Sequence, residues 1–187
     1  MKTPVSIAIL CAFSFIILKM IFHFTGMFVG DITPMAMINM LCLLLSVSVG
    51  LYFHFSTRKE PSESFMSELK QGLKAGMVYT FIVSGFLYLY YSQIDQKVIF
   101  DMQSERIEYF REALNDPAQF SQIKKSNKAY ELMTAEEMLE DFRANTITII
   151  SARSVFLMSL MAMMLLSIGY SLMITIIYRT VLFRKRA

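Results

Sequence analysis

Lys19 is the residue whose type and position most need a chemical explanation. It is the only Asp, Glu, Lys or Arg in the apolar run Val5–Phe24, and His23 follows it at i+4 on the same helical face. A charge inside a membrane span commonly marks an ion or substrate pathway. Alternatively, the Lys19 side chain extends its ammonium to the outer headgroups and has no role of its own. The sequence leaves both interpretations open.

Other polar residues are expected at a similar depth and would form an outer polar cluster with Lys19 and His23. They are Asp31, Asn39 and Arg153. Such a cluster would suit a small oligomeric transporter or channel. His23 and His54 are expected at opposite ends of their spans, so they do not form a metal pair. The sequence predicts no metal, no other cofactor and no catalytic residue, because it has neither an embedded carboxylate nor a phosphate-binding loop.

Four apolar runs, each 20 to 25 residues long, must position these side chains: Val5–Phe24, Pro34–Phe55, Ala75–Ile94 and Ser154–Tyr178. A helix of about 20 apolar residues crosses a hydrocarbon core of about 30 Å. Backbone groups in lipid must be paired within their own segment. The chain is therefore predicted to be an all-α protein, a four-span transmembrane helical bundle embedded in a lipid bilayer. The first run lacks a cleavage site and is expected to remain as a span.

The distribution of basic residues predicts the orientation. The N-terminus, the 56–74 connection and the C-terminal tail carry nine Lys or Arg residues against three Glu, whereas the 25–33 connection has none of either basic type. Because positive charge is retained on the cytoplasmic side, both termini and the 56–74 connection are predicted to be cytoplasmic. The basic tail is explained by this topology, so it gives no support for nucleic-acid binding.

Residues 95–150 form the one long hydrophilic stretch and are predicted to be an extracytoplasmic helical hairpin. Phe100, Ile107, Phe110 and Leu114 have helical spacing, and Asn115-Asp116-Pro117 should end that helix. Thr134 and Glu137 form a capping box that should start another helix near Ala135. Since no Gly or Pro separates these helices from the flanking spans, we expect both to continue unbroken into the membrane.

Small residues at i+4 spacing predict where the spans pack. Gly72, Gly76, Thr80 and Ser84 form one ridge on the third span, and Cys42, Ser46 and Gly50 form another on the second. Helices in lipid associate through close approach at small residues, because lipid provides no hydrophobic drive. These ridges are expected to be seams within one molecule, with a homodimer seam as the alternative. Cys11 and Cys42 are expected to be packing residues.

The chain resembles an uncharacterised family of small four-span bacterial inner-membrane proteins, a domain of unknown function. The segment Phe65-x-x-x-Leu69-Lys70-x-Gly72-Leu73-Lys74 enters the third span, an acidic helical segment with Glu136-Glu137-Met138 follows, and the last span ends in Arg184-Lys185-Arg186. The resemblance implies a location in the bacterial inner membrane, and the family provides no catalytic residues to transfer.

These observations divide the chain into residues 1–94 with three spans, the hairpin 95–150, and residues 151–187 with the fourth span and the basic tail. The leading functional hypothesis is a non-enzymatic accessory or scaffold protein that binds a protein partner, or a further copy of itself, through the hairpin. The alternative is the transporter or channel that uses the cluster around Lys19.

Overall fold

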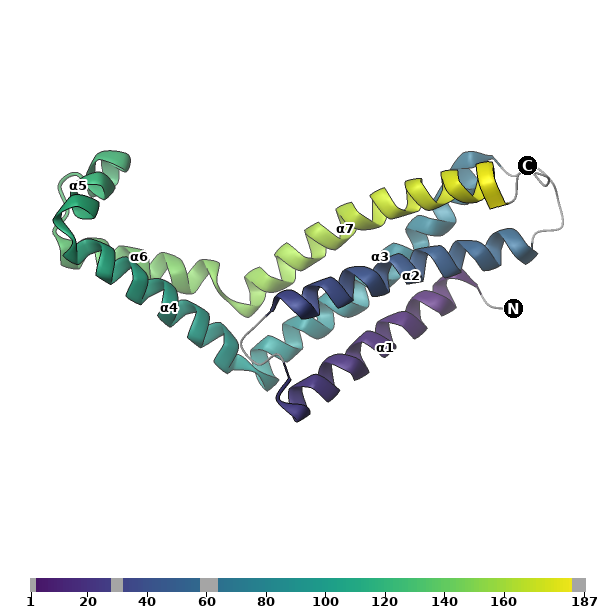
Figure 1. Ribbon diagram of the computed structural model, residues 1–187, viewed down its shortest axis with the longest axis horizontal. Coiled ribbons are helices and arrows are strands. Elements are labelled where there is room, and N and C mark those ends of the chain that lie inside the picture. The colour runs from purple at the N-terminus through teal and green to yellow at the C-terminus, as the bar shows by residue number, and fades with distance from the viewer. Residues whose placement is uncertain (1–2, 28–31, 58–63, 183–187) are drawn as a thin grey trace. The chain divides into compact units, whose positions relative to one another are not determined.

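A computed structural model describes residues 3–27, 32–57 and 64–182, and within these ranges it contains seven α-helices and no strand (Figure 1). The elements are α1 (Pro4–Thr25), α2 (Thr33–Thr57), α3 (Phe65–Leu89), η1 (Tyr90–Ile94), α4 (Gln96–Asn115), α5 (Pro117–Ser126), η2 (Lys128–Tyr130), α6 (Ala135–Ile149), α7 (Ala152–Ile177) and η3 (Tyr178–Leu182). Of the short elements, η1 and η3 are π-helical and η2 is a 3₁₀-helix.

Four helical segments are long and apolar enough to cross a membrane: α1, α2, α3 with η1, and α7 with η3. Their mean hydropathies are 2.5, 2.0, 1.4 and 2.1. The prediction of an all-α chain with four membrane-spanning segments is thus confirmed at the level of helix length and composition. Most of the side chains in these segments are not buried inside the protein, as expected for helices whose outer surfaces face lipid.

The chain divides into two compact units. Unit 1 comprises residues 1–87 and 156–187, and unit 2 comprises residues 88–155. Helix α1 packs along α2 in unit 1. The core of unit 1 repeats every four residues on two helices, with Leu43, Val47, Leu51 and Phe55 on α2 and Ala75, Tyr79, Val83 and Leu87 on α3. Both sets have the i+4 spacing of one helix face.

Unit 2 is built on α4 and α6, whose contact centres on two stacked rings. The rings of Phe110 and Phe142 lie 3.9 Å apart with an interplanar angle of 11°. Met138, four residues before Phe142 on α6, is fully buried, whereas Phe100 on α4 is 65% exposed. The predicted apolar stripe is therefore not buried at Phe100.

The predicted ends of the hydrophilic helices are largely confirmed. Helix α4 ends at Asn115, and Asp116 then caps α5 by accepting a 2.9 Å hydrogen bond from the backbone N–H of Ala118. The capping box of α6 is present, since the N–H of Glu137 donates to the Thr134 hydroxyl and the N–H of Thr134 donates to the Glu137 carboxylate. Hydrogen bonds from Thr134 lower the pKa of Glu137.

The expectation that both hydrophilic helices run unbroken into the spans was wrong. The first leg is interrupted at Asp95, whose φ of −128° and ψ of 61° are not helical and whose carboxylate accepts a hydrogen bond from the Tyr90 hydroxyl. The second leg is interrupted at Ile150 and Ser151. The Ser151 hydroxyl accepts a 3.2 Å hydrogen bond from the N–H of Ser154, so it caps the start of α7. Both legs are therefore interrupted at positions that have neither Gly nor Pro.

Candidate functional site

The predicted ridge on α3 faces α7 and α2 within unit 1. A Cβ atom added to Gly76 would lie 2.8 Å from the Ser167 Cβ and would overlap the Ser167 hydroxyl oxygen. A Cβ on Gly72 would lie 3.1 Å from Ser171 and 3.0 Å from Leu51. The two glycines therefore permit a separation between α3 and α7 that any other residue would increase.

Helix α7 presents a matching row of residues that the sequence analysis did not identify. Ser159, Ser167, Ser171 and Thr175 lie at multiples of four residues, with Met163 completing the row. The two rows run in opposite directions, because Ser171 meets Gly72, Ser167 meets Gly76 and the Ser159 hydroxyl lies 3.4 Å from that of Ser84. We call this contact the α3–α7 seam. The i+4 spacing of hydroxyl residues on the fourth run was the signal that could have revealed it.

Several hydroxyl groups in and beside the seam are buried without a hydrogen-bond partner in the described part of the chain: Ser46, Thr80, Ser167, Ser171 and Thr175. More exposed hydroxyls bond instead to the carbonyl four residues earlier, as Thr57 does to Phe53 and Thr180 to Ile176. Tight packing thus takes precedence over hydrogen bonding in the seam. An unsatisfied buried hydroxyl costs about 1–3 kcal/mol.

Asn39 joins three helices of unit 1. Its side-chain carbonyl accepts a 2.8 Å hydrogen bond from the Tyr79 hydroxyl on α3, and its amide nitrogen lies 3.3 Å from the Met163 sulfur on α7. Tyr79 is fully buried, and the other two residues are almost so. Asn39, predicted as a member of the outer polar cluster, therefore makes polar contacts that link α2, α3 and α7.

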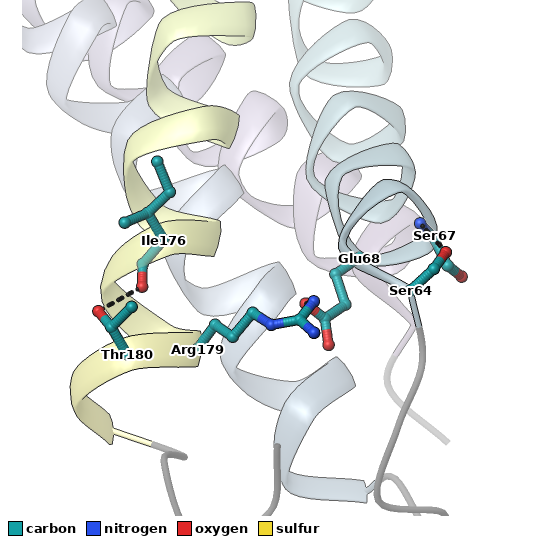
Figure 2. A network of polar contacts seen from close by, with 6 residues as sticks. All are labelled: Ser64, Ser67, Glu68, Ile176, Arg179 and Thr180. Atoms are coloured by element: carbon teal, nitrogen blue, oxygen red, sulfur yellow. Dashed lines mark hydrogen bonds and ion pairs between the residues drawn. The ribbon is translucent and has the colours of Figure 1, made fainter.

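A partly buried ion pair, shown in Figure 2, lies beyond Gly72 and Ser171 at one end of the α3–α7 seam. Glu68 in the first turn of α3 is completely buried, and its carboxylate lies 3.4 Å from the guanidinium of Arg179 in η3. The Arg179 side chain remains 34% exposed. Both charges are favourably placed for the helix dipoles, the acid at an N-terminus and the base near a C-terminus. Both residues were predicted only as charges of the cytoplasmic connection and tail, and their contact was not predicted.

The remaining members of the predicted polar cluster are found in different surroundings. Lys19 is 6% exposed within unit 1, which does not fit a side chain extended to the headgroup layer. His23 is half-buried in the same unit, whereas Arg153 is exposed and belongs to unit 2. Asp31 lies outside the described residues.

An open groove of about 610 Å³ lies between α4 and α6 in unit 2. Its lining is apolar and aromatic with one pair of opposite charges: Met102, Glu105, Arg106, Tyr109, Phe110, Phe142 and Ile150. Tyr109 is 73% exposed on its rim, and the Arg106 guanidinium carbon lies 5.9 Å from the centre of the Phe142 ring. We call this surface the α4–α6 groove. Its combination of exposed aromatic and methionine side chains is typical of protein-binding surfaces.

A second, smaller groove between the same helices is mainly charged. Its volume is about 380 Å³, and it is lined by Ser104, Ile107, Glu108, Arg111, Glu136, Leu139, Glu140 and Arg143. Glu108 and Arg111 pair with each other at 2.8 Å across one turn of α4. Within the described ranges, no three His, Cys, Asp or Glu side chains are grouped closely enough to hold a metal ion.

No protein-family model, curated protein or solved structure matches the chain. The resemblance to the four-span inner-membrane family therefore stays a prediction from the order of the elements.

Proposed function

We propose that this chain is a non-enzymatic scaffold or accessory protein of the bacterial inner membrane, with both termini cytoplasmic, that binds a protein partner through residues 95–150. The observation that supports this function is the α4–α6 groove, in which the Tyr109 and Met102 side chains remain exposed. Four apolar helices provide the membrane attachment. A connection between two spans needs only a few residues, and a separate packed unit is far longer than that.

The shape and lining of the groove favour an amphipathic helix as the bound segment. Such helices insert apolar side chains at i, i+3, i+4 and i+7 into a groove between two helices. Aromatic rings and Met102 supply the apolar floor and adaptable packing. Glu105 and Arg106 supply one charge of each sign, which would fix the direction of the bound helix.

Site-specific photo-crosslinking in native membranes tests this function. A photoreactive amino acid at position 109 should give adducts that map to one helical segment of a protein. Met102→Glu should reduce their yield at least tenfold, because it places a charge on the apolar floor of the groove. The control position is Leu132, which is 95% exposed and does not line the groove. Equal adduct patterns at positions 109 and 132, or lipid adducts alone, would contradict the proposal.

The burial of Lys19 favours a second candidate function, transport of an ion or small solute through unit 1. A buried ammonium in a membrane span commonly belongs to a translocation pathway. In this case Lys19→Met should abolish solute flux into vesicles containing the purified protein, whereas replacing Gln96–Asn145 by a short Gly/Ser linker should preserve it. The scaffold function, in which a partner docks on residues 95–150, predicts the reverse pattern for partner binding. The linker variant should lose its partner, and the Lys19→Met variant should keep it.

A further inference from the structure

We infer that the helix bound in the α4–α6 groove is α4 of a second copy of this chain, lying antiparallel to the first. This inference rests on the proposed docking function and names its partner. It follows from the order of four residues on α4, Met102, Glu105, Arg106 and Tyr109, which all line the groove and are all exposed.

These four residues lie on one face of the helix, because their spacing is i, i+3, i+4 and i+7. They are also arranged symmetrically about a point midway between Glu105 and Arg106. When two copies of α4 run antiparallel across a two-fold axis at that point, residues equally far from it meet. Met102 then faces Tyr109 of the other copy, and Glu105 faces Arg106 of the other copy.

The resulting contacts are chemically complementary, and symmetry makes each of them occur twice. A methionine sulfur packs favourably against an aromatic ring, and the carboxylate of Glu105 meets a guanidinium. A parallel pair would instead place Glu105 against Glu105 and Arg106 against Arg106, which opposes like charges. The face is therefore complementary to itself in one direction only.

The groove also provides room for the side chain that the second copy brings. In this pairing the Tyr109 ring of the second copy enters beside Met102 and Ile150 of the first copy. Arg106 of the first copy remains over its own Phe142 ring. A contact of two helical turns is smaller than a typical interface between soluble proteins. Confinement of both copies to one bilayer raises their effective concentration and so lowers the affinity that pairing requires.

Membrane insertion adds one geometric requirement. Two copies inserted in the same orientation share a two-fold axis along the membrane normal. An antiparallel pair is perpendicular to its own two-fold axis. The dimer therefore requires α4 to be perpendicular to the membrane normal. Crosslinks between position 102 of one copy and position 109 of the other would indicate that arrangement.

Cysteine crosslinking of the full chain in native membranes tests the pairing. In a Cys11→Ala, Cys42→Ala background, copies with Met102→Cys and one epitope are co-expressed with copies carrying Tyr109→Cys and another epitope. A short thiol crosslinker should join the unlike copies at least tenfold more efficiently than the like copies. The second Met102–Tyr109 contact stays intact in this mixed dimer. Crosslinks only between like positions, or none between copies, would overturn the inference.

Charge reversal provides an independent test with a rescue. Glu105→Arg alone and Arg106→Glu alone should each reduce the crosslink between positions 102 and 109 of the two copies at least fivefold. Each substitution places side chains of the same charge opposite each other in both symmetric contacts. The double variant Glu105→Arg/Arg106→Glu should restore it, since every copy carries both changes. Failure of the rescue in variants that melt at the normal temperature would contradict the pairing.

The two proposals fail in different ways. If the mixed crosslink is absent but the photoreactive group at position 109 labels a helix of another protein, docking holds and the second copy is not the partner. If position 109 labels no protein at all, the docking function itself is wrong.

Discussion

The substitution Gly76→Ala tests the close approach of α3 and α7 most directly. The new Cβ would lie 2.8 Å from the Ser167 Cβ and would overlap the Ser167 hydroxyl oxygen, so one helix must shift. Overpacking of this kind typically costs about 1–3 kcal/mol. Against this, alanine is favoured over glycine inside a helix by about 0.8–1 kcal/mol. The net destabilisation from Gly76→Ala is therefore smaller than the packing cost alone.

Gly85→Ala on the same helix is the matched control. A Cβ at Gly85 meets no atom within 4 Å, so this variant should gain only the helix propensity. The difference between the two variants removes the propensity contribution and should equal the packing cost, about 1–3 kcal/mol. Unfolding by SDS titration in mixed micelles measures both free energies. Gly76→Leu should be worse than Gly76→Ala, whereas Met77→Leu, at a position 38% exposed, should be nearly neutral.

A second substitution can confirm the cause of the loss. Ser167→Gly removes the two atoms closest to the new Cβ, so it should recover much of the stability lost in Gly76→Ala. Interacting residues show such coupling in a double-mutant cycle, whereas distant ones add independently. Equal unfolding free energies for Gly76→Ala and Gly85→Ala, or no coupling to Ser167, would refute the assignment of this contact as a packing seam.

Three further predictions concern the ion pair, the capping box and the topology. Arg179→Met should lower the free energy of unfolding in detergent by about 1–3 kcal/mol, because it removes the cation beside buried Glu68. Adding Glu68→Gln should recover part of this lost stability. Equal stability of the single and double variants would contradict the assignment of the ion pair. Hydrogen bonds from Thr134 lower the pKa of Glu137. Their stabilisation of α6 is therefore present above the unfolded carboxyl pKa and is lost as the pH falls through the lower folded pKa. Hydrogen exchange at the first turn of α6 should show this pH dependence, and Glu137→Gln should abolish it. A fluorescent protein fused to the C-terminus should be bright in the cytoplasm and a periplasmic reporter near Pro117 active, and the reverse result would overturn the proposed orientation.

The spans were predictable because a single physical requirement determines them. An apolar run long enough to cross lipid must be helical, whatever its neighbours are. The capping box at Thr134 and the break before Pro117 were also predictable, since both depend on side chains within three or four residues of the helix end. Local chemistry and composition thus determined most of the helices.

The helix breaks at Asp95 and Ser151 were not predicted, because neither position has the Gly or Pro that most clearly marks a helix end. A polar side chain with a local hydrogen bond lies at each break: Asp95 accepts from the Tyr90 hydroxyl in one leg, and the Ser151 hydroxyl accepts from the N–H of Ser154 in the other. Serine and aspartate also occur inside helices, so their presence alone does not indicate a boundary.

The α3–α7 seam was only half predicted, since its partner row on α7 depends on which helices meet. Extending the row of glycines by one step at i−4 would have reached Glu68, and extending the row of hydroxyls by one step at i+4 would have reached Arg179. The meeting of the two charges is a tertiary fact that neither row reveals by itself. The α4–α6 groove likewise could not be predicted from the sequence, because it depends on the stacking of Phe110 on Phe142.

The separation of Glu68 from Arg179 along the chain has a consequence for biosynthesis. The two residues are 111 positions apart, and the ribosome adds about 5–20 residues per second, so the carboxylate is made roughly 6 to 22 seconds before its guanidinium. Throughout that interval α3 must be delivered to the membrane without Arg179. The helical segment that carries Arg179 is therefore made well after α3 and completes this contact, and chains truncated before it should be substrates for membrane quality control.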